Sequence, residues 1–349
     1  MMKKMMKAAV LKEFRKPLSL EEIPIPEPGP GEVLVKVVGS GLCATDLHIR
    51  DGRIPTVKVP YVPGHEMAGI IEQLGEGVTA HDVGEHVVVG IDVVCGECDL
   101  CKAGKSHLCR NRVRIGFERD GSHEEYCVVP EETLFPIRDD IPLDEACIIP
   151  DAVSCMYHAI KDQGQVKKGD KILIYGAGAL GIQGVQAAKY LGAEVYVSGR
   201  TQAKLDASKE FGADTVINTK QQDLHEEIMK LTEGLGCDVI FDLVGLNDSI
   251  DKLFRMLKPS GKLVEIGYMD TNFTVNYQET VVKEKEIIGV RGCTRENLEE
   301  CIKLVEQGVL KPYIYKKYPL EKINEALEGL EKFQSVGRSV ISYALPEGE

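Results

Sequence analysis

Residues 170–200, "DKILIYGAGALGIQGVQAAKYLGAEVYVSGR", constrain the fold more than any other stretch of the chain. The apolar run "KILIY" predicts a β-strand, "IQGVQAAKYLG" predicts a helix, and "AEVYVSG" predicts a second strand. Further predicted strands, "TVINT", "CDVIFDLVG", "GKLVEIGY" and "EIIGVRG", alternate with predicted helices along the chain that follows. This alternation is typical of a doubly wound α/β domain with a parallel sheet.

The turn after the first of these strands carries Gly176, Gly178 and Gly181 in a G-x-G-x-x-G pattern. The motif alone is weak, but here a predicted strand precedes it and a predicted helix follows it, as a dinucleotide site requires. Glycines at these positions let the backbone approach a pyrophosphate at the N-terminus of the helix. We therefore predict that this domain binds a dinucleotide.

The end of the second strand indicates which dinucleotide is preferred. An NAD site normally places Asp or Glu there, whereas this chain has Gly199, Arg200 and Thr201. An acid would repel the extra phosphate of NADP by about 4 kcal/mol at 4 Å and an effective dielectric of ~20, and an arginine reverses that sign. We predict NADP over NAD; the alternative is that Arg200 faces solvent or stacks on the adenine.

The first part of the chain differs in composition and residue pattern. It contains short alternating runs rich in Val, Gly and Pro, such as "GEVLVKVVGSGLC" and "GEHVVVGIDVVC". These runs predict short strands separated by turns, hence a β-rich, barrel-like domain. The last predicted strand, "GRSVISYAL", could return to it. We predict one domain from residues 1–150 with 315–349, and a second from 151–314.

Four cysteines lie close together in "CGECDLCKAGKSHLC", with gaps of two, two and seven residues: Cys95, Cys98, Cys101 and Cys109. Two-residue gaps allow thiolates to converge on one metal ion. Ferredoxin-like runs begin with the same gaps but normally end C-x₃-C-P, which this segment lacks. Four sulfur ligands leave no open position, so the pattern predicts a structural zinc site.

A second metal site is indicated by Cys43 and His65, which lie in separate glycine-flanked loops and are each followed by an acidic residue. A catalytic zinc needs three protein ligands and one open position. Asp151 is a candidate third ligand, and Cys147 and Cys155 are rivals for that position.

These motifs together resemble the zinc-dependent medium-chain alcohol dehydrogenases. "GHEMAGIIEQLGEGV" fits the G-H-E-x₂-G-x₅-G-x₂-V pattern of that family, "GLCATDLH" resembles its first-ligand loop, and the four-cysteine segment matches its structural-zinc lobe. The resemblance covers nearly the whole chain. It implies a GroES-like barrel domain and a Rossmann domain, a catalytic zinc held by Cys43, His65 and Asp151, and a second, structural zinc.

The resemblance also implies roles around the metal. Asp46 would orient His65, as ligating histidines require, and Glu66 would be an acid near the metal. Thr45 and His48 occupy the places of the family's proton relay. The family's basic residue after the first cysteine is replaced by alanine, which leaves Arg338 as a candidate for the pyrophosphate.

The implied activity is the interconversion of an alcohol and its aldehyde or ketone by hydride transfer with NAD(P). The alternatives are a zinc-independent quinone or enoyl reductase of the same superfamily, which would lack Cys43, His65 and the cysteine lobe, and a non-catalytic NADP(H)-binding protein.

A net charge of −13 argues against nucleic acid and anionic membranes as partners. Eleven cysteines in a chain without a recognisable secretory signal favour a reducing cytoplasm. Relatives of this kind imply a homodimer or homotetramer.

Overall fold

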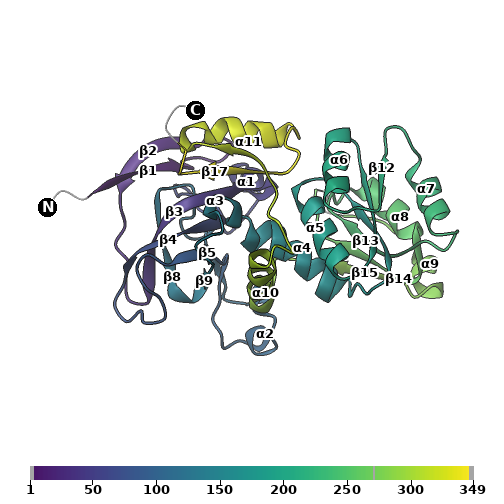
Figure 1. The fold of residues 1–349 in the computed structure, drawn as a ribbon, viewed down its shortest axis with the longest axis horizontal. Helices are drawn as coiled ribbons and strands as arrows, with labels where there is room; N and C mark the ends of the chain where they lie inside the picture. Colours follow the sequence, from purple (N-terminus) through teal and green to yellow (C-terminus); the bar gives the residue numbers. More distant parts are fainter. Residues whose placement is uncertain (1–3, 270–271, 346–349) are drawn as a thin grey trace. The chain divides into compact units, whose positions relative to one another are not determined.

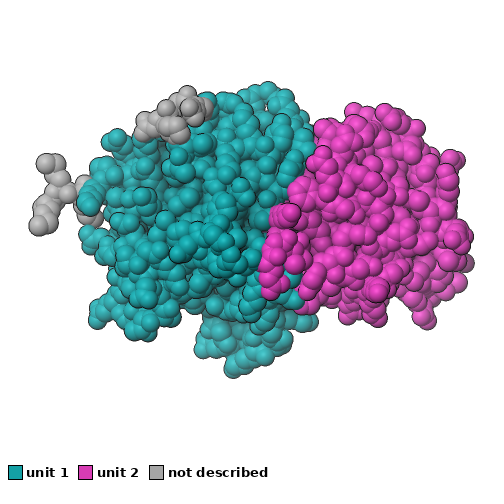
Figure 2. All heavy atoms as spheres, viewed as in Figure 1, with its two compact units in different colours: residues 1–151, 294–306, 312–349 teal, residues 152–293, 307–311 magenta. Residues whose placement is uncertain are grey.

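The structure, a computed structural model, describes residues 4–269 and 272–345. The chain divides into two compact units, shown in Figures 1 and 2. Unit 1 comprises residues 1–151, 294–306 and 312–349, and unit 2 comprises residues 152–293 and 307–311. Residues 294–306, which the sequence assigned to the second domain, cluster with unit 1. Their helix is tied there because Arg295 Nη1 donates to the carbonyl of Glu132 (2.7 Å) and Arg138 N donates to Glu306 Oε1 (3.0 Å).

Unit 1 is built on a seven-stranded sheet. Its main path runs β16 (Ile314–Tyr318), β17 (Arg338–Ser342), β3 (Glu32–Leu42), β4 (Glu66–Leu74), β5 (His86–Val89) and β9 (Leu134–Pro136), and β8 (Tyr126–Pro130) pairs with β3. All pairs are antiparallel except β16 with β17. Alternate residues of the long strand β3, such as Val33, Val35 and Val37, enter one buried core, as period-two alternation predicts.

Shorter elements complete unit 1. Strands β1 (Met5–Val10) and β2 (Ser19–Pro24) form one two-stranded sheet, and β6 (Asp92–Val93) and β7 (Val113–Arg114) form another. Its helices are α1 (Ala44–Arg50), α2 (Asp99–Lys102), α3 (Leu143–Ala146), α10 (Arg295–Glu306) and α11 (Ile323–Glu331), and it has 3₁₀ turns at Ser106–Leu108, Glu131–Thr133 and Leu320–Lys322. A π-helical turn, Ile149–Val153, spans the boundary between the units.

Unit 2 is a six-stranded, fully parallel sheet in the order β12 (Thr215–Asn218), β11 (Glu194–Gly199), β10 (Lys171–Tyr175), β13 (Cys237–Asp242), β14 (Leu257–Glu265) and β15 (Glu286–Gly289). Its helices are α4 (Ser154–His158), α5 (Ala179–Tyr190), α6 (Gln202–Glu210), α7 (Leu224–Leu231), α8 (Asn247–Arg255) and α9 (Tyr277–Val282), and Ala159–Gln163 is π-helical. The predicted doubly wound parallel sheet is confirmed.

The strand order of unit 2 also locates its binding edge. From β10 the chain first moves outward through β11 and β12, then returns to the other side of β10 with β13. The order therefore reverses between β10 and β13, and ligands of such sheets bind beyond the carboxyl ends of the strands at that point. None of the helices in residues 4–269 and 272–345 combines the length and the apolar character needed to cross a bilayer.

Candidate metal centre and dinucleotide site

Three neighbouring strands of unit 1 bring the predicted metal ligands together. In the ladder, Leu42 at the end of β3 pairs with Ser339 of β17, and Gly41 pairs with Glu66 at the start of β4. Cys43 follows β3 directly and His65 precedes β4 directly, so both lie at the same sheet edge. Gly41 is required there, because a β-carbon at that position would lie 1.8 Å from Glu66 Oε2.

Cys43, His65 and Asp151 offer a sulfur, a nitrogen and an oxygen atom that all lie within 4.8 Å of one another. Asp151 sits in the π-helical turn and brings Oδ2 to 3.8 Å from His65 Nε2. Cys43 and His65 are buried, and Nε2 of His65 has no hydrogen-bond partner. One Cys, one His and one carboxylate form a three-ligand set that suits a catalytic zinc. Among the described residues, the rival Cys147 does not join this group, and its thiol contacts the Asp144 carbonyl instead.

The charges at this site favour a cation beside His65. Burial alone would lower the pKa of His65, but the carboxylates of Asp46 and Asp151 outweigh burial and raise it well above its usual value. Burial alone would raise the pKa of Asp151, but the imidazole of His65 lowers it below its usual range. A metal ion would supply the positive charge that these groups favour.

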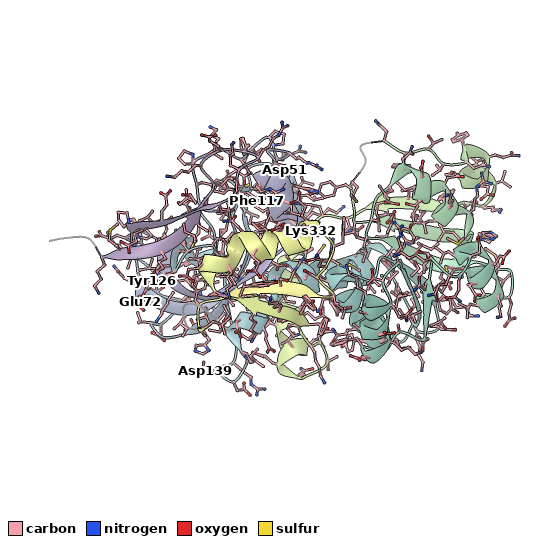
Figure 3. All side chains as sticks on the ribbon, turned by 90° about the horizontal axis from the view of Figure 1, so that it is seen from above. Asp51, Glu72, Phe117, Tyr126, Asp139 and Lys332 are labelled. Atoms are coloured by element: carbon pink, nitrogen blue, oxygen red, sulfur yellow. The ribbon has the colours of Figure 1, made fainter. Side chains whose placement is uncertain are left out.

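Asp46 holds the other side of the imidazole. Its Oδ1 lies 3.3 Å from His65 Nδ1, and its Oδ2 accepts a hydrogen bond of 2.7 Å from the backbone N–H of Cys43. One carboxylate thus contacts both predicted ligands, as expected for a residue that orients a ligating histidine. The ring of Phe117, labelled in Figure 3, packs against the His65 ring with centroids 5.3 Å apart.

Glu66 and Arg338 form a buried ion pair beside the three ligands. Arg338 Nη2 donates to Glu66 Oε1 (2.6 Å) and to Asp151 Oδ2 (3.1 Å). Burial raises the pKa of Glu66, and the guanidinium of Arg338 opposes that shift and favours the carboxylate. The sequence assigned Arg338 to the pyrophosphate; the structure shows its guanidinium engaged by two carboxylates, and a contact with the cofactor stays a prediction.

Thr45 and His48 lie three residues apart on α1, a spacing that makes them neighbours on a helix surface. Thr45 Oγ1 is 3.6 Å from Cys43 Sγ. His48 is half-buried, and burial together with nearby Arg53 lowers its pKa. Thr45 is thus next to the predicted metal ligand Cys43, and a proton path through Thr45 and His48 remains a prediction.

The four cysteines of the lobe between β6 and β7 converge, with their sulfur atoms all within 4.8 Å of one another. Cys109 Sγ lies 3.4 Å from Cys95 Sγ and 3.9 Å from Cys98 Sγ, and the thiols are free rather than bridged. Backbone N–H groups of Arg110 and Cys101 lower the pKa of Cys98 to about 6, which favours a thiolate. Four thiols without an open position fit a structural zinc ion.

The three glycines of the dinucleotide motif follow β10 in unit 2. Gly176 has φ +122°, a value that favours glycine, and Gly178 is the N-cap of α5. A β-carbon on Gly178 would meet no atom within 4 Å, whereas one on Gly181 would lie 2.2 Å from the Gly176 carbonyl oxygen. Gly181 therefore allows the helix to approach the turn, and Gly178 leaves open space at the helix N-terminus. Both features fit a bound pyrophosphate.

Gly199 ends β11, and the exposed Arg200 and Thr201 follow it, with Thr201 as the N-cap of α6. The structure adds Lys204, in the first turn of α6, which the sequence interpretation did not single out. It is half-buried, and burial lowers its pKa. The sequence could have pointed to Lys204, because it lies four residues after Arg200. Both cations follow the strand end that faces the adenosine in such folds.

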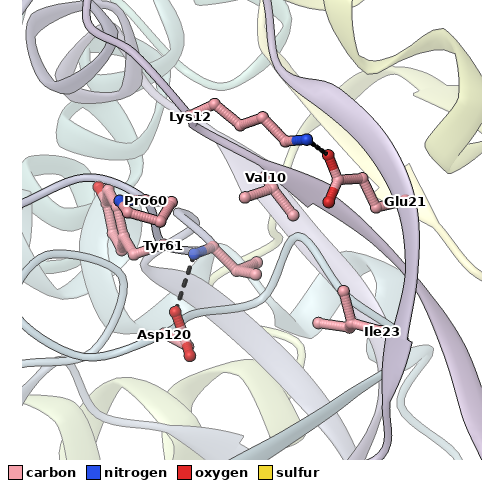
Figure 4. A pocket seen from close by; sticks show the side chains of 8 residues that line it. Val10, Lys12, Glu21, Ile23, Pro60, Tyr61 and Asp120 are labelled. Carbon is pink, nitrogen blue, oxygen red and sulfur yellow. Dashed lines mark hydrogen bonds and ion pairs between the residues drawn. The ribbon is translucent and has the colours of Figure 1, made fainter.

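A separate hollow of about 420 Å³ lies between β1, β2 and the segment around Tyr61 in unit 1 (Figure 4). Val10, Ile23 and Pro60 contribute apolar walls, and Lys12 forms an ion pair with Glu21 at its rim. None of the described residues that line it is a predicted site residue. The hollow therefore contributes nothing to the metal centre.

Comparisons with known proteins agree with this geometry. The alcohol dehydrogenase GroES-like domain matches residues 29–139, and the zinc-binding dehydrogenase domain matches residues 179–307. An alcohol dehydrogenase from Geobacillus stearothermophilus is 34% identical over 96% of this chain and 99% of its own. An L-threonine 3-dehydrogenase from Rhizobium etli is 32% identical over 98% of this chain and 100% of its own.

Solved structures are similar over the same length. The cobalt- and zinc-bound thermostable alcohol dehydrogenase from Pyrobaculum aerophilum has a TM-score of 0.88 with 31% identity, and the match covers 97% of this chain and 100% of that one. Both units of the present chain are therefore found together, in one polypeptide, in a solved structure.

Proposed function

Because this chain belongs to the zinc-dependent medium-chain alcohol dehydrogenases, which interconvert alcohols and carbonyl compounds with NAD(P), we propose that Cys43, His65 and Asp151 hold its catalytic zinc. The observation that carries this proposal is the buried Nε2 of His65. It has no hydrogen-bond partner and shares a 4.8 Å cluster with a thiol and a carboxylate. Leaving such a nitrogen unpaired costs free energy that a metal bond would recover.

When bound, zinc supplies a Lewis acid for the substrate oxygen, and the dinucleotide supplies the hydride acceptor or donor. The residues of the chain then have separate tasks. Asp46 fixes the orientation of His65 from the Nδ1 side, and the hydroxyl of Thr45 takes up the alcohol proton while it releases its own proton to the next acceptor. His48, half-buried on the same helix face, passes that proton towards solvent.

Arg338 keeps two carboxylates next to the metal from repelling each other. Its guanidinium bonds both Glu66 and Asp151, so the net charge of the ligand set stays low. With Arg338 present, Asp151 can serve as the third ligand although the buried Glu66 lies beside it. A second zinc, held by the four cysteines, pins the loop between β6 and β7 and has a structural role.

For the cofactor, the chain favours NADP over NAD. No acid stands at the end of β11, and Arg200 and Lys204 place two cations in the segment that follows it. A 2′-phosphate would be attracted there, whereas an acidic residue would repel it. The proposed dinucleotide contacts are Gly176, Gly178, Gly181, Gly199, Arg200 and Thr201.

The substrate is a small alcohol or carbonyl compound, and the chain works as a homo-oligomer. Strand β15 is the last strand of its sheet, and α9 exposes 79% of Tyr277 and 72% of Val282 nearby in the sequence. A terminal strand can pair with a strand of a second copy of the same chain, and exposed apolar side chains favour burial in a contact between copies. Among the described residues, no disulfide joins any of the eleven cysteines, which fits a reducing cytoplasmic setting.

A substrate panel tests the activity. Primary, secondary and polyhydric alcohols, with the matching carbonyls, would be assayed with each nicotinamide cofactor by absorbance at the reduced cofactor's band. We expect alcohol-dependent reduction of the cofactor, faster with NADP. Cofactor binding without turnover of any alcohol or carbonyl would contradict the proposal.

A further inference from the structure

A chain of buried polar side chains runs from the metal centre into the interior of unit 1. Asp46 Oδ1, which faces His65 Nδ1, also lies 3.8 Å from Nε2 of His123. On its other side, His123 Nδ1 is 2.8 Å from Ser40 Oγ, which is 2.5 Å from Ser122 Oγ. His123, Ser40 and Ser122 are all 0% exposed. Solvent therefore does not supply their hydrogen bonds.

The backbone holds His123 firmly in this position. Its N–H donates to the carbonyl of Pro63 (3.0 Å), and its carbonyl accepts from the N–H of Ala9 (2.8 Å). A β-carbon on Gly64 would lie 2.7 Å from His123 Nδ1, so the residue before His65 must be a glycine for the ring to fit. The imidazole is packed against the ligand loop itself.

The charge on Asp46 selects one tautomer of His123. Burial lowers the pKa of His123 to about 4, so the ring is neutral and carries a single N–H. If that hydrogen were on Nδ1, the lone pair of Nε2 would face the Asp46 carboxylate, which is repulsive. With the hydrogen on Nε2, the ring presents a donor to Asp46, and the hydroxyl of Ser40 donates to Nδ1.

We propose that His123 is a positioning residue for the catalytic zinc, which acts by presenting Nε2–H to the Asp46 oxygen that orients His65. The Ser40 hydroxyl stabilises the tautomer of His123 that carries its hydrogen on Nε2, because it donates to Nδ1. Asp46 is buried, and its charged form needs donors; the Cys43 N–H donates to Oδ2, while Oδ1 has no hydrogen-bond partner and faces His65 Nδ1 at 3.3 Å and His123 Nε2 at 3.8 Å. Residues behind a metal ligand typically change metal affinity 10- to 100-fold. The inference rests on the proposed zinc site at Cys43, His65 and Asp151.

The test is the affinity of the full-length protein for zinc. Zinc would be titrated against a chromophoric chelator, and the absorption spectrum of the cobalt(II)-loaded protein would be recorded in parallel. Cys43→Ala lacks one predicted ligand of the catalytic zinc but keeps the four cysteines of the lobe. It therefore measures the zinc that the lobe binds on its own. The variants are His123→Phe, which keeps the ring volume, His123→Gln, which keeps a donor, and Ser40→Ala. Tyr343→Phe is the matched control, because Tyr343 donates only to the Ser122 carbonyl (2.8 Å) at the end of the same network.

We expect His123→Phe to weaken zinc binding about 10-fold and to shift the cobalt absorption bands, with His123→Gln restored to within about 3-fold of wild type. Ser40→Ala should weaken binding about 3-fold, and Tyr343→Phe should leave it unchanged. A His123→Phe variant with wild-type zinc affinity and an unaltered cobalt spectrum would overturn the proposal, whatever the thermal stability of that variant. Equal losses in the Phe and Gln variants would overturn it too, by showing a packing role alone. If the wild type holds no more zinc than Cys43→Ala, the proposed metal site itself is wrong.

Discussion

Arg338 and Glu66, 272 positions apart in the chain, are joined by a hydrogen-bonded ion pair of 2.6 Å that is almost completely buried. The side chains are 5% and 0% exposed. The pair exists because β17 and β4 flank β3 in the sheet, so the first residues of both strands meet beside the end of β3. It links β17 to the predicted metal centre.

Removing Arg338 should therefore destabilise unit 1. Arg338→Met leaves Glu66 buried without its partner, and breaking one side of a buried pair costs about 3–5 kcal/mol. Urea unfolding of the zinc-loaded protein, followed by circular dichroism, measures this loss. Arg255→Met is the control: its pair with Asp251 is 2.8 Å long, but the two side chains are 49% and 34% exposed, so its loss should cost less than about 1 kcal/mol. Equal effects of the two substitutions would contradict the structural role given to Arg338.

The cysteine lobe should lose its metal independently of catalysis. Cys101→Ser removes one of four thiolates, so we expect the loss of one zinc per chain and a lower unfolding temperature. Since no position in this site is open to substrate, the KM for alcohol should change less than about 2-fold at temperatures where the variant is folded. Loss of turnover in a folded Cys101→Ser variant that retains its other zinc would assign the lobe a different role.

Cofactor preference should follow the charge after β11. Arg200→Asp replaces an exposed cation, which attracts a 2′-phosphate, by an anion, which repels it. Because solvent and salt screen both interactions, we expect the ratio of kcat/KM for NADP to that for NAD to fall about 100-fold, which corresponds to about 2.7 kcal/mol. Lys204→Met should lower the ratio in the same direction by a smaller factor. Lys209→Met, at the far end of α6, is the control and should not change it. A wild-type enzyme that prefers NAD would refute this part of the proposal.

The carboxyl edge of the sheet in unit 2 should make stability depend on pH. Glu265 ends β14 beside Asp242 of β13, and burial, with a smaller contribution from Asp242, raises the pKa of Glu265 to about 8. A carboxyl with a folded-state pKa above its unfolded value contributes stability below about pH 4.5 that is lost as the pH rises to 8.

Glu265→Gln removes that dependence. Relative to wild type, the variant should gain on the order of 1–2 kcal/mol between pH 5 and pH 9, a figure reduced for the partial exposure of the side chain. Unfolding temperatures at both pH values measure it. Glu286→Gln, an exposed carboxylate on the neighbouring strand β15, should show no such change. A difference between wild type and Glu265→Gln that is the same at both pH values would contradict the assignment.

Local patterns predicted the parts of this protein that depend on short stretches of chain. The strand and glycine turn at 171–181 lead into a helix as expected, and the four cysteines converge because two-residue gaps in a tight lobe leave them little alternative. The doubly wound sheet followed from the alternation of apolar strands and helices, which is also a local property.

Features set by the sheet ladder were beyond the reach of sequence reasoning. Nothing in "VGRSV" reveals that β17 pairs with β3 and brings the Arg338 guanidinium to Glu66, and the contact of Arg338 with the pyrophosphate stays a prediction. His123 was not singled out, because its nearness to Asp46 depends on where the segment before β8 crosses the ligand loop. The placement of α10 with unit 1 depends likewise on contacts with residues more than 160 positions earlier.

The zinc content of three matched proteins tests the central claim most directly. Wild type, Cys43→Ala and Asp151→Ala would be purified without chelator, checked for folding by circular dichroism, and analysed for zinc per chain and for alcohol oxidation. We predict two zinc ions in the wild type and, in each variant, one zinc ion, a retained fold and no measurable turnover. Two zinc ions and wild-type turnover in a folded Cys43→Ala or Asp151→Ala protein would show that the catalytic metal is held elsewhere.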